Sequence, residues 1–299
     1  MTVESIGVPF DGYGRQGHQS RAAQVLRENG LSRVLHEHGT DSGDLDLPAF
    51  ETSRGAQTGL LNEPALLEMT WQLSHRVCEV LGQGRFPLVV GGDCSLLLGV
   101  MKGVEEALGD AGLMFFDGHE DTMPLDVVED GEAANCELGL LLGLTGRLLP
   151  QEIAKRLPII HRSALAVLGT RDDDWRRRFN IGTLADWGVL TRPLEQLQPS
   201  PTTTAESAAE HLNGSASGWW LHIDLDVLDP QIFGAQGLPG YPDEPGGLTF
   251  DQLQEALTAA MSAGGCIGMS VTIYDPAQDP ERTDAKNIAS LIEGALTAR

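Results

Sequence analysis

Three short apolar segments each end in a cluster of polar residues, and this pattern constrains the fold most strongly. The segments at 86–90, 113–116 and 219–223 are mostly apolar and predict buried strands. They are followed directly by G-G-D-C-S, D-G-H-E-D and D-L-D-V-L-D-P. In open sheets of parallel strands, ligand sites form at the carboxyl ends of the strands. We therefore expect the three polar clusters to converge on one crevice.

Predicted strands and helices alternate along the chain. Strands are expected at 5–9, 86–90, 113–117, 164–169, 219–225 and 266–273, and helices at 20–37, 63–81, 96–108, 133–144, 174–178, 250–263 and 283–296. Gly-rich or Pro-rich stretches at 38–59, 198–205 and 233–247 predict loops. The third loop is either a wall or lid of the crevice or an ordinary surface excursion. The alternation predicts an α/β fold with an open, mostly parallel sheet flanked by helices.

The composition bounds the class of protein. A chain of 299 residues can form one large domain, which we expect to span 1–299. The 43 acidic against 20 basic residues give a formal charge of -23, which disfavours nucleic acid and anionic membranes as partners and tolerates a cationic small molecule. Such a charge also simply keeps a protein soluble. No leader-like start or apolar run of about 18 residues is evident, so we expect a cytoplasmic protein. The four cysteines form no C-x-x-C pair.

Two of the polar clusters repeat metal-ligand residue types at a spacing of two. Asp117, His119 and Asp121 form one set, and Asp224 and Asp226 form the other. Residues i and i+2 of an extended segment point to the same face, so the carboxylates repel one another unless a cation lies between them. Helix caps and turns also favour Asp, but they do not require this spacing twice. A divalent metal site is the favoured interpretation.

Asp93 and Asp229 lie next to these sets. Both are expected to orient ligands or backbone rather than to bind metal. A plain turn role for Asp229, which precedes Pro230, is an equal alternative.

Together these motifs resemble the three metal-binding signatures of the arginase (ureohydrolase) superfamily, in the same order. V-P-F at 8–10, L-R-E-N-G-L at 26–31, G-T-R-D-D at 169–173 and G-G-L-T at 246–249 extend the resemblance over nearly the whole chain. The resemblance implies a single-domain, three-layer α/β sandwich with two Mn²⁺ ions, whose bridging hydroxide attacks a guanidinium carbon. It also implies a homo-oligomer, commonly a trimer or hexamer.

The resemblance also implies a ligand set for each ion. One ion would be held by Cys94, Asp117, Asp121 and Asp224, and the other by His119, Asp117, Asp224 and Asp226. Cys94 stands where the family has His. A thiolate is softer than imidazole and shifts preference from Mn²⁺ toward Fe²⁺, Co²⁺, Ni²⁺ or Zn²⁺. Four outcomes for the metal site remain open: a working pair of ions with mixed ligands, one weak and one strong site, a single ion, or an inert buried Cys94.

The family pattern further implies an amino-acid-like substrate. Asn135 matches the Asn that contacts the substrate α-carboxylate, and Asp174 matches the acidic residue that receives the α-amino group. Glu137 stands where the family has a His that shuttles protons, so Glu137 and Asp121 are the candidate catalytic residues. Asn135 as a helix cap and Asp174 as a solvated turn residue are the alternatives.

The largest departure from the family lies near the C-terminus. Active members have a Glu that holds the guanidinium, and Ile273 occupies that position here in S-V-T-I-Y-D-P. An unpaired buried guanidinium is costly. Arginine is therefore a poor candidate unless Glu137, Glu244 or Asp275 supplies the charge, whereas a hydroxylated guanidine, whose oxygen can coordinate metal, needs the Glu less. Tyr274 either donates a hydrogen bond to substrate or packs in the core.

Three functions follow from these residues. The first is a dinuclear metal hydrolase acting on a guanidino or amidino amino-acid derivative, with Nω-hydroxyarginine as an example. The second is a metal-dependent amino-acid racemase or epimerase, in which a metal hydroxide or Glu137 removes the α-proton. The third is a non-catalytic relative that binds an amino acid or metal.

Overall fold

The structure is a computed structural model that describes residues 1–15, 17–144, 157–236 and 246–299. Its strands are β1 (Val3–Gly7), β2 (Gly39–Asp44), β3 (Phe86–Val90), β4 (Gly112–Phe116), β5 (Leu165–Leu168), β6 (Leu190–Arg192), β7 (Trp219–Asp224) and β8 (Cys266–Thr272). Its helices are α1 (Ala22–Leu26), α2 (Ser32–His38), α3 (Glu63–Gly82), α4 (Leu97–Leu108), α5 (Glu137–Leu141), α7 (Asp173–Arg178), α8 (Leu194–Leu197), α9 (Pro201–Ser215), α10 (Phe250–Ser262) and α11 (Thr283–Ala298). None of these described helices is both long and apolar enough to cross a membrane.

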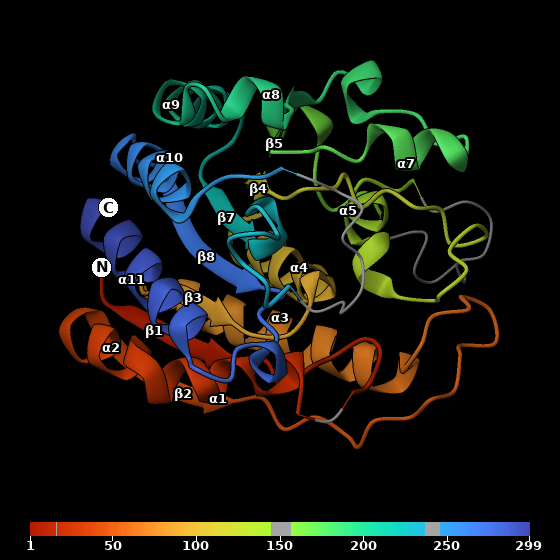
Figure 1. The fold of residues 1–299 in the computed structure, drawn as a ribbon, viewed down its shortest axis with the longest axis horizontal. Helices are drawn as coiled ribbons and strands as arrows, with labels where there is room; N and C mark the ends of the chain where they lie inside the picture. Colours follow the sequence, from red (N-terminus) through yellow and green to blue (C-terminus); the bar gives the residue numbers. More distant parts are fainter. Residues whose placement is uncertain (16, 145–156, 237–245) are drawn as a thin grey trace.

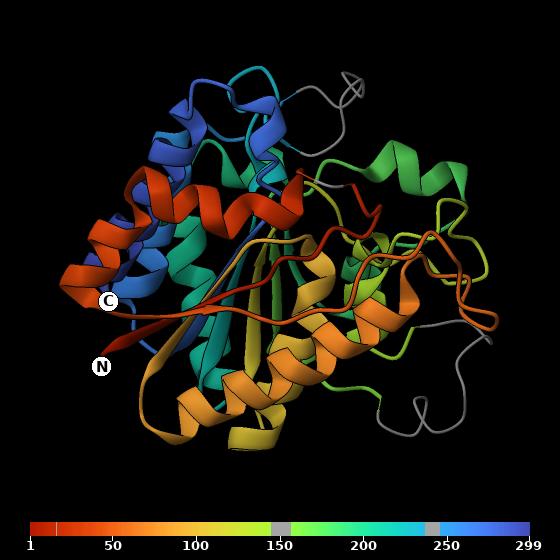
Figure 2. The same ribbon diagram turned by 90° about the horizontal axis from the view of Figure 1, so that it is seen from below.

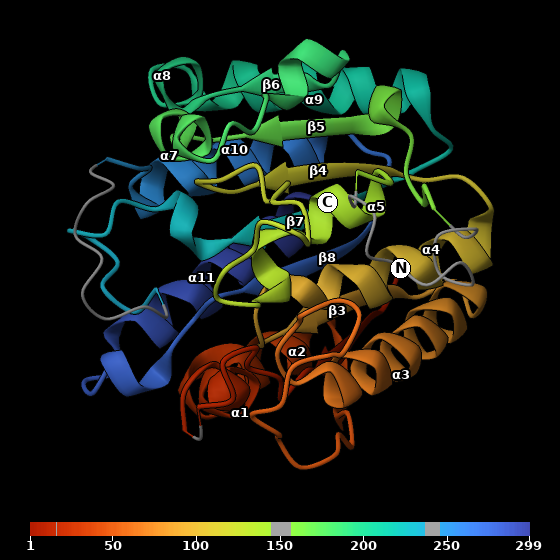
Figure 3. The ribbon, with the colours of Figure 1, turned by 90° about the vertical axis from the view of Figure 1, so that its right-hand side faces the viewer.

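The strands of the described residues form one parallel sheet in the order β2-β1-β3-β8-β7-β4-β5-β6. Figure 3 shows them lying side by side from β3 to β6. The register aligns Val90, Val271, Ile223 and Phe116 in one row across the four central strands. Because these strands run in the same direction, the segments that follow them emerge at one edge. The predicted parallel sheet is confirmed, and the three polar clusters share that edge.

Helices cover both faces of the sheet (Figure 1). One core contains side chains of α1, α2, α9, α10 and α11, and the other contains side chains of α3, α4 and α5. Strand β4 contributes Met114 and Phe116 to the first core and Leu113 and Phe115 to the second, as period-two alternation requires. Figure 2 shows α3 and α4 on the opposite side of the sheet from α1 and α11. Burial on both faces explains why the central strands are apolar runs.

Four elements were not predicted. Strand β2 lies inside the expected loop at 38–59, helix α9 begins inside the expected loop at 198–205, and β6 and α8 fall where no element was expected. Strands β2 and β6 are the edges of the sheet, where short polar sequences are tolerated. The buried face of α9 is built mostly from alanines, which give a weak hydrophobic pattern.

The predicted helix at 20–37 is also corrected. Helices α1 and α2 are separated by a kinked turn, η2 (Arg27–Leu31), in which Gly30 has φ +132°. A Cβ at this position would lie 3.0 Å from the Cβ of Ala289 on α11. Gly30 is therefore required both by the backbone conformation and by the close approach of α11.

Candidate metal centre

The segment after β3 places Cys94 at the start of a short 3-10 turn, η3 (Cys94–Leu96). Asp93 caps this turn, because its Oδ1 accepts a hydrogen bond from the Ser95 amide at 3.0 Å. Its Oδ2 accepts another from the Gly12 amide at 2.6 Å, and burial raises the pKa of Asp93 to about 6. Asp93 thus holds backbone in place, as expected, while Cys94 is fully buried beside it.

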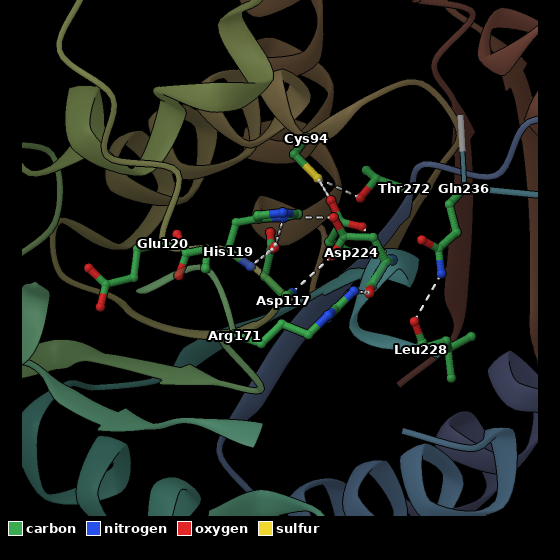
Figure 4. Close-up of polar contacts among 12 residues, drawn as sticks. Cys94, Asp117, His119, Glu120, Arg171, Asp224, Leu228, Gln236 and Thr272 are labelled. Atoms are coloured by element: carbon green, nitrogen blue, oxygen red, sulfur yellow. Dashed lines mark hydrogen bonds and ion pairs between the residues drawn. The ribbon is translucent and has the colours of Figure 1, made fainter. Parts of the chain in front are cut away.

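The segment after β4 presents alternate side chains to two different environments. Asp117 and His119 face one another, with Asp117 Oδ1 accepting a hydrogen bond from the His119 amide at 2.6 Å. Glu120 points the other way (Figure 4), where it accepts hydrogen bonds from Thr183 Oγ1 at 2.7 Å and the Leu184 amide at 2.8 Å. Asp121 has φ +42°, an uncommon conformation for a residue other than glycine. Glu120 therefore anchors the loop from behind while its neighbours face the sheet edge.

The segment after β7 joins the other two. Asp224 Oδ1 accepts a hydrogen bond from the Asp226 amide at 2.7 Å, and Asp226 Oδ1 accepts one from the Gly118 amide at 2.9 Å. Asp226 Oδ2 lies 2.8 Å from His119 Nδ1. Arg171, after β5, donates to the Asp226 carbonyl at 2.8 Å. These contacts fix the loops of β4 and β7 relative to one another.

Two groups of possible metal ligands meet at Asp117 (Figure 4). In one group, ligand atoms of Cys94, Asp117 and Asp224 all lie within 4.8 Å of one another, and in the other the same holds for Asp117, His119 and Asp121. Because Asp117 belongs to both groups, the arrangement can hold two neighbouring cations that share a carboxylate.

The electrostatics of the site fit a bound cation. Burial and the neighbouring carboxylates raise the pKa of Asp117, Asp121 and Asp224 well above the usual range. Asp117 Oδ2 is buried and has no hydrogen-bond partner in the described part of the chain. A buried carboxylate oxygen without a partner is costly, and a divalent cation bound by it relieves this cost. The residues present therefore suit a metal centre.

Asp226 differs from the other carboxylates. Burial works to raise its pKa, but the neighbouring His119 and Arg171 outweigh burial and hold that pKa well below its usual range. Asp226 therefore stays ionised beside His119 across the physiological pH range.

Sequence reasoning missed one polar residue at this site, His222. Its Nε2 lies 3.3 Å from the sulfur of Cys94, and its side chain is fully buried, which lowers the pKa of the imidazole to about 3. The sulfur also lies 2.6 Å from Asp224 Oδ2 and 3.0 Å from Thr272 Oγ1. The available signal was the spacing of two between His222 and Asp224, which places both side chains on the same face of β7. The apolar residues around His222 concealed it.

The predicted substrate residues occupy different positions. Glu137 begins α5 and is fully buried, and its charge helps to raise the pKa of Asp121. The catalytic roles of Glu137 and Asp121 stay predictions. Asn135 Nδ2 donates a hydrogen bond to Asp130 Oδ2 at 2.9 Å. The side chain of Asp174 is 89% exposed and pairs with Arg177. The substrate roles of Asn135 and Asp174 stay predictions.

The end of β8 is occupied by Ile273, which has φ +72° and donates its amide to the Gly92 carbonyl at 3.0 Å. Of the proposed replacement charges, Asp275 is buried and already bonded to His18, Gln278 and the Ala277 amide. Glu244 lies outside the described residues, as does most of the loop at 233–247 whose role as a wall or lid was open.

Tyr274 is buried, and its hydroxyl donates a hydrogen bond to Asp279 Oδ2 at 2.9 Å. This contact satisfies the hydroxyl within the protein. The role of Tyr274 as a donor to substrate stays a prediction.

Fold and site together define an α/β protein with a candidate two-ion centre at the carboxyl edge of a parallel sheet. The model of the arginase family matches residues 2–297, so the chain belongs to the arginase family. This confirms the resemblance noted in the sequence.

Individual relatives are distant but cover the chain. The arginase of Bacillus caldovelox is 27% identical over 98% of this chain and 97% of its own length. The solved structure of the arginase from Bacillus caldovelox superposes with a TM-score of 0.86 at 25% identity, and the match covers 99% of this chain and 98% of that one. The arginase of Schizosaccharomyces pombe is 26% identical over 92% of this chain and 84% of its own. Proclavaminate amidino hydrolase from Streptomyces clavuligerus shares the fold, with a TM-score of 0.71 at 21% identity. The match covers 99% of this chain and 91% of that one.

Proposed function

We propose that this protein is a metal-dependent hydrolase that cleaves a C–N bond of a guanidino or amidino amino-acid derivative, with Nω-hydroxyarginine preferred over arginine. The observation that carries the proposal is the pair of ligand groups that share Asp117. Two cations held next to one another are the arrangement that activates water for attack on an unreactive carbon. Membership of the arginase family supports this choice of reaction.

In this proposal, Cys94, Asp117, Asp121 and Asp224 would hold one ion, and His119, Asp117, Asp224 and Asp226 would hold the other. The two observed groups support the sharing of Asp117, but they bring Asp121 together with His119 rather than with Cys94. When bound, the two ions would lower the pKa of a shared water molecule and supply hydroxide. Mn²⁺ suits the carboxylate-rich set, whereas the thiolate of Cys94 favours Fe²⁺, Co²⁺, Ni²⁺ or Zn²⁺ at the first position.

Glu137 and Asp121 are the groups of this chain that would handle protons. Burial raises the pKa of Glu137 well above its usual range, so this carboxyl can hold a proton near neutral pH. A group in that state can protonate the leaving nitrogen as a general acid. Asp121 lies beside Glu137 and can accept a hydrogen bond from the attacking water.

The substrate preference follows from Ile273. A cationic guanidinium at the end of β8 would meet an alkyl side chain, while the Asp275 carboxylate is committed to His18, Gln278 and the Ala277 amide. The desolvated charge would therefore lack a partner there. A hydroxylated guanidine brings an oxygen that can bind metal and so depends less on a carboxylate at residue 273.

The test is to compare purified, metal-loaded protein on Nω-hydroxyarginine and arginine, with release of hydroxyurea or urea as the readout. We expect a higher kcat/KM for Nω-hydroxyarginine by at least about 10-fold, the effect of about 1.4 kcal/mol. A preference for arginine would overturn the substrate assignment. Absence of hydrolysis across a panel of guanidino and amidino compounds would overturn the proposed reaction.

The buried Glu137 carboxyl also supports a second candidate, a metal-dependent amino-acid racemase or epimerase. With no carboxylate at residue 273, an amino acid can bind through its own carboxylate, and Glu137 can remove the α-proton. Incubation in heavy water separates the two reactions. Deuterium at Cα without loss of a C–N bond would favour the racemase, and hydrolysis without deuterium incorporation would favour the hydrolase.

A further inference from the structure

We propose that Trp220, Ser270 and His222 form a hydrogen-bonded relay that directs an N–H group at the sulfur of Cys94 and positions this sulfur as a metal ligand. The inference rests on the metal site of the proposed function. His222 acts through Cys94 and is therefore a positioning residue.

The relay is built by the register of three adjacent strands. His222 on β7 lies directly opposite Ser270 on β8 and opposite Phe115 on β4. The His222 and Phe115 rings stack, with centroids 5.1 Å apart and an interplanar angle of 13°. Trp220, two residues before His222, points to the same face of β7. The imidazole is thus fixed on both sides by the sheet.

Gly268 makes room for the first member of the relay. It is paired with Trp220 across β7 and β8, and a Cβ at residue 268 would lie 2.1 Å from the indole ring. Only a residue without a side chain allows the indole to lie across β8 in this way. The indole Nε1 then reaches the Ser270 hydroxyl at 2.9 Å.

The direction of each hydrogen bond follows from the donors available. The indole N–H of Trp220 can only donate, so Ser270 Oγ accepts from it. Within the described residues, the other hydrogen-bond partner of Ser270 Oγ is His222 Nδ1, at 2.7 Å, so the Ser270 hydroxyl donates to Nδ1. His222 is fully buried and no carboxylate is among its hydrogen-bond partners in the described part of the chain, so the imidazole is neutral. With Nδ1 accepting from Ser270, the hydrogen lies on Nε2, whose nearer partner is the Cys94 sulfur at 3.3 Å and whose more distant one is Thr272 Oγ1 at 3.5 Å.

An N–H donor at this place suits a metal-binding sulfur. A thiolate accepts hydrogen bonds and donates none, and groups that bond to a metal ligand from behind fix its orientation and tune its donor strength. On its other side the sulfur meets Asp224 at 2.6 Å, within the ligand group that includes Asp117. The relay would therefore occupy one lone pair of the sulfur and fix its orientation, while the other lone pairs remain able to bind a metal.

Co²⁺ provides a direct test, because a Co²⁺-bound thiolate gives a charge-transfer absorption band. We would record this band for the wild-type protein, for Cys94→Ser to assign it, and for His222→Phe, His222→Gln and Ser270→Ala. An N–H···S bond stabilises the sulfur electrons, so its loss should shift the band to lower energy in His222→Phe. The Gln side chain can still donate an N–H group and should keep the band near the wild-type position. Ser270→Ala, which frees the imidazole to place its hydrogen on Nδ1, should shift the band in the same direction as His222→Phe.

Each outcome decides the inference. A band that stays unmoved in Ser270→Ala overturns the relay while leaving the proposed metal site intact, and this small substitution decides the question even if His222→Phe does not fold. A shift in His222→Gln equal to that in His222→Phe also overturns it, because the effect would then be one of packing. A wild-type protein that binds Co²⁺ without any band assigned to Cys94 overturns both the relay and the sulfur ligand of the proposed function.

Discussion

The sulfur of Cys94 lies 2.6 Å from Oδ2 of Asp224, although the two residues are 130 positions apart in the sequence and strand β8 separates their strands. A sulfur packed for its volume alone would have apolar neighbours. This one is surrounded by Asp224, Thr272 and His222. These polar neighbours support the proposal that Cys94 is a ligand and not an inert core residue.

The Cys94→His variant should bind Mn²⁺ more tightly than the wild-type protein, because imidazole suits Mn²⁺ better than a soft thiolate does. Calorimetric titration of metal-free protein measures the change. We expect about a 10-fold gain, within the range by which changes around a metal site alter affinity. Cys266→Ser is the matched control, since Cys266 is buried at the start of β8. An equal effect in both variants would contradict a ligand role for Cys94.

The Asp226→Asn variant should lose activity by more than about 100-fold, because it removes a charge from the second metal position and weakens the contact with His119. Steady-state kinetics with saturating metal measures this loss. Asp229→Asn is the control: among the described residues the Asp229 carboxylate accepts its hydrogen bond from the Gln231 amide, and the variant should retain most activity. A wild-type rate in Asp226→Asn would refute the assigned site.

The Ile273→Glu variant should gain activity toward arginine relative to Nω-hydroxyarginine. The new carboxylate would pair with the guanidinium. In a buried site this ion pair is worth about 3 kcal/mol, so the ratio of the two kcat/KM values should change by about 100-fold. Ile273→Gln, of similar length but uncharged, should leave the ratio near that of the wild type. If both variants shift the ratio equally, the effect arises from shape and not from charge.

The stabilisation of the protein by Mn²⁺ should grow as the pH rises. In the metal-free fold, the pKa values of four carboxyl groups are raised: those of Asp117, Asp121, Asp224 and Glu137. At pH values above the ordinary pKa of a carboxyl group, the folded state therefore binds more protons than the unfolded state. The metal-free protein therefore loses stability as the pH rises through these folded pKa values, while fewer protons compete with metal. The lowered pKa of Asp226 has the opposite sign, and its contribution is lost only under acidic conditions.

Thermal unfolding with and without Mn²⁺ at about pH 5.5 and about pH 8 checks this sign. Asp117→Asn should raise the melting temperature of the metal-free protein at the higher pH, because it removes a buried charge, and should reduce the Mn²⁺ effect. A Mn²⁺ shift that is larger at the lower pH would contradict the account.

The Arg176→Met variant should lower the free energy of unfolding by about 3–5 kcal/mol, because it leaves buried carboxylates unpaired. Arg176 is 5% exposed and bridges Glu120 and Asp172 at 3.2 and 3.0 Å, which holds the loop that carries His119 and Asp121. Arg177→Met is the control, since Arg177 is exposed and its pair with Asp174 should be worth less than about 1 kcal/mol. Denaturant titration of both variants measures the difference. Similar losses in the two would show that Glu120 is not held by charge.

The central strands and the clustering of the candidate metal ligands were predictable from the sequence because each has a local signal. Buried parallel strands are apolar runs, and the spacing of two in D-G-H-E-D and D-L-D marks one face of an extended segment. Edge strand β2, G-T-D-S-G-D, carries no such signal, because its partner on the sheet specifies it more than its own side chains do.

The remaining parts of the site depend on contacts between distant segments. His222 becomes a neighbour of Cys94 only when β7 pairs with β8 and β8 pairs with β3. Likewise, the pairing of Asp275 with His18 joins residues 257 positions apart, so the sequence alone left Asp275 open as a partner for the guanidinium. Such relationships are set by tertiary packing: the spacing of two places His222 on the same face as Asp224, but it does not reveal Cys94 as its neighbour.

The metal content of the protein tests the central claim most directly. Elemental mass spectrometry on protein purified without added metal, and again after incubation with Mn²⁺ and removal of free ions, counts the ions per chain. The account predicts close to two ions after incubation, because the two ligand groups share Asp117. One ion or none would contradict the dinuclear centre and, with it, the proposed hydrolysis.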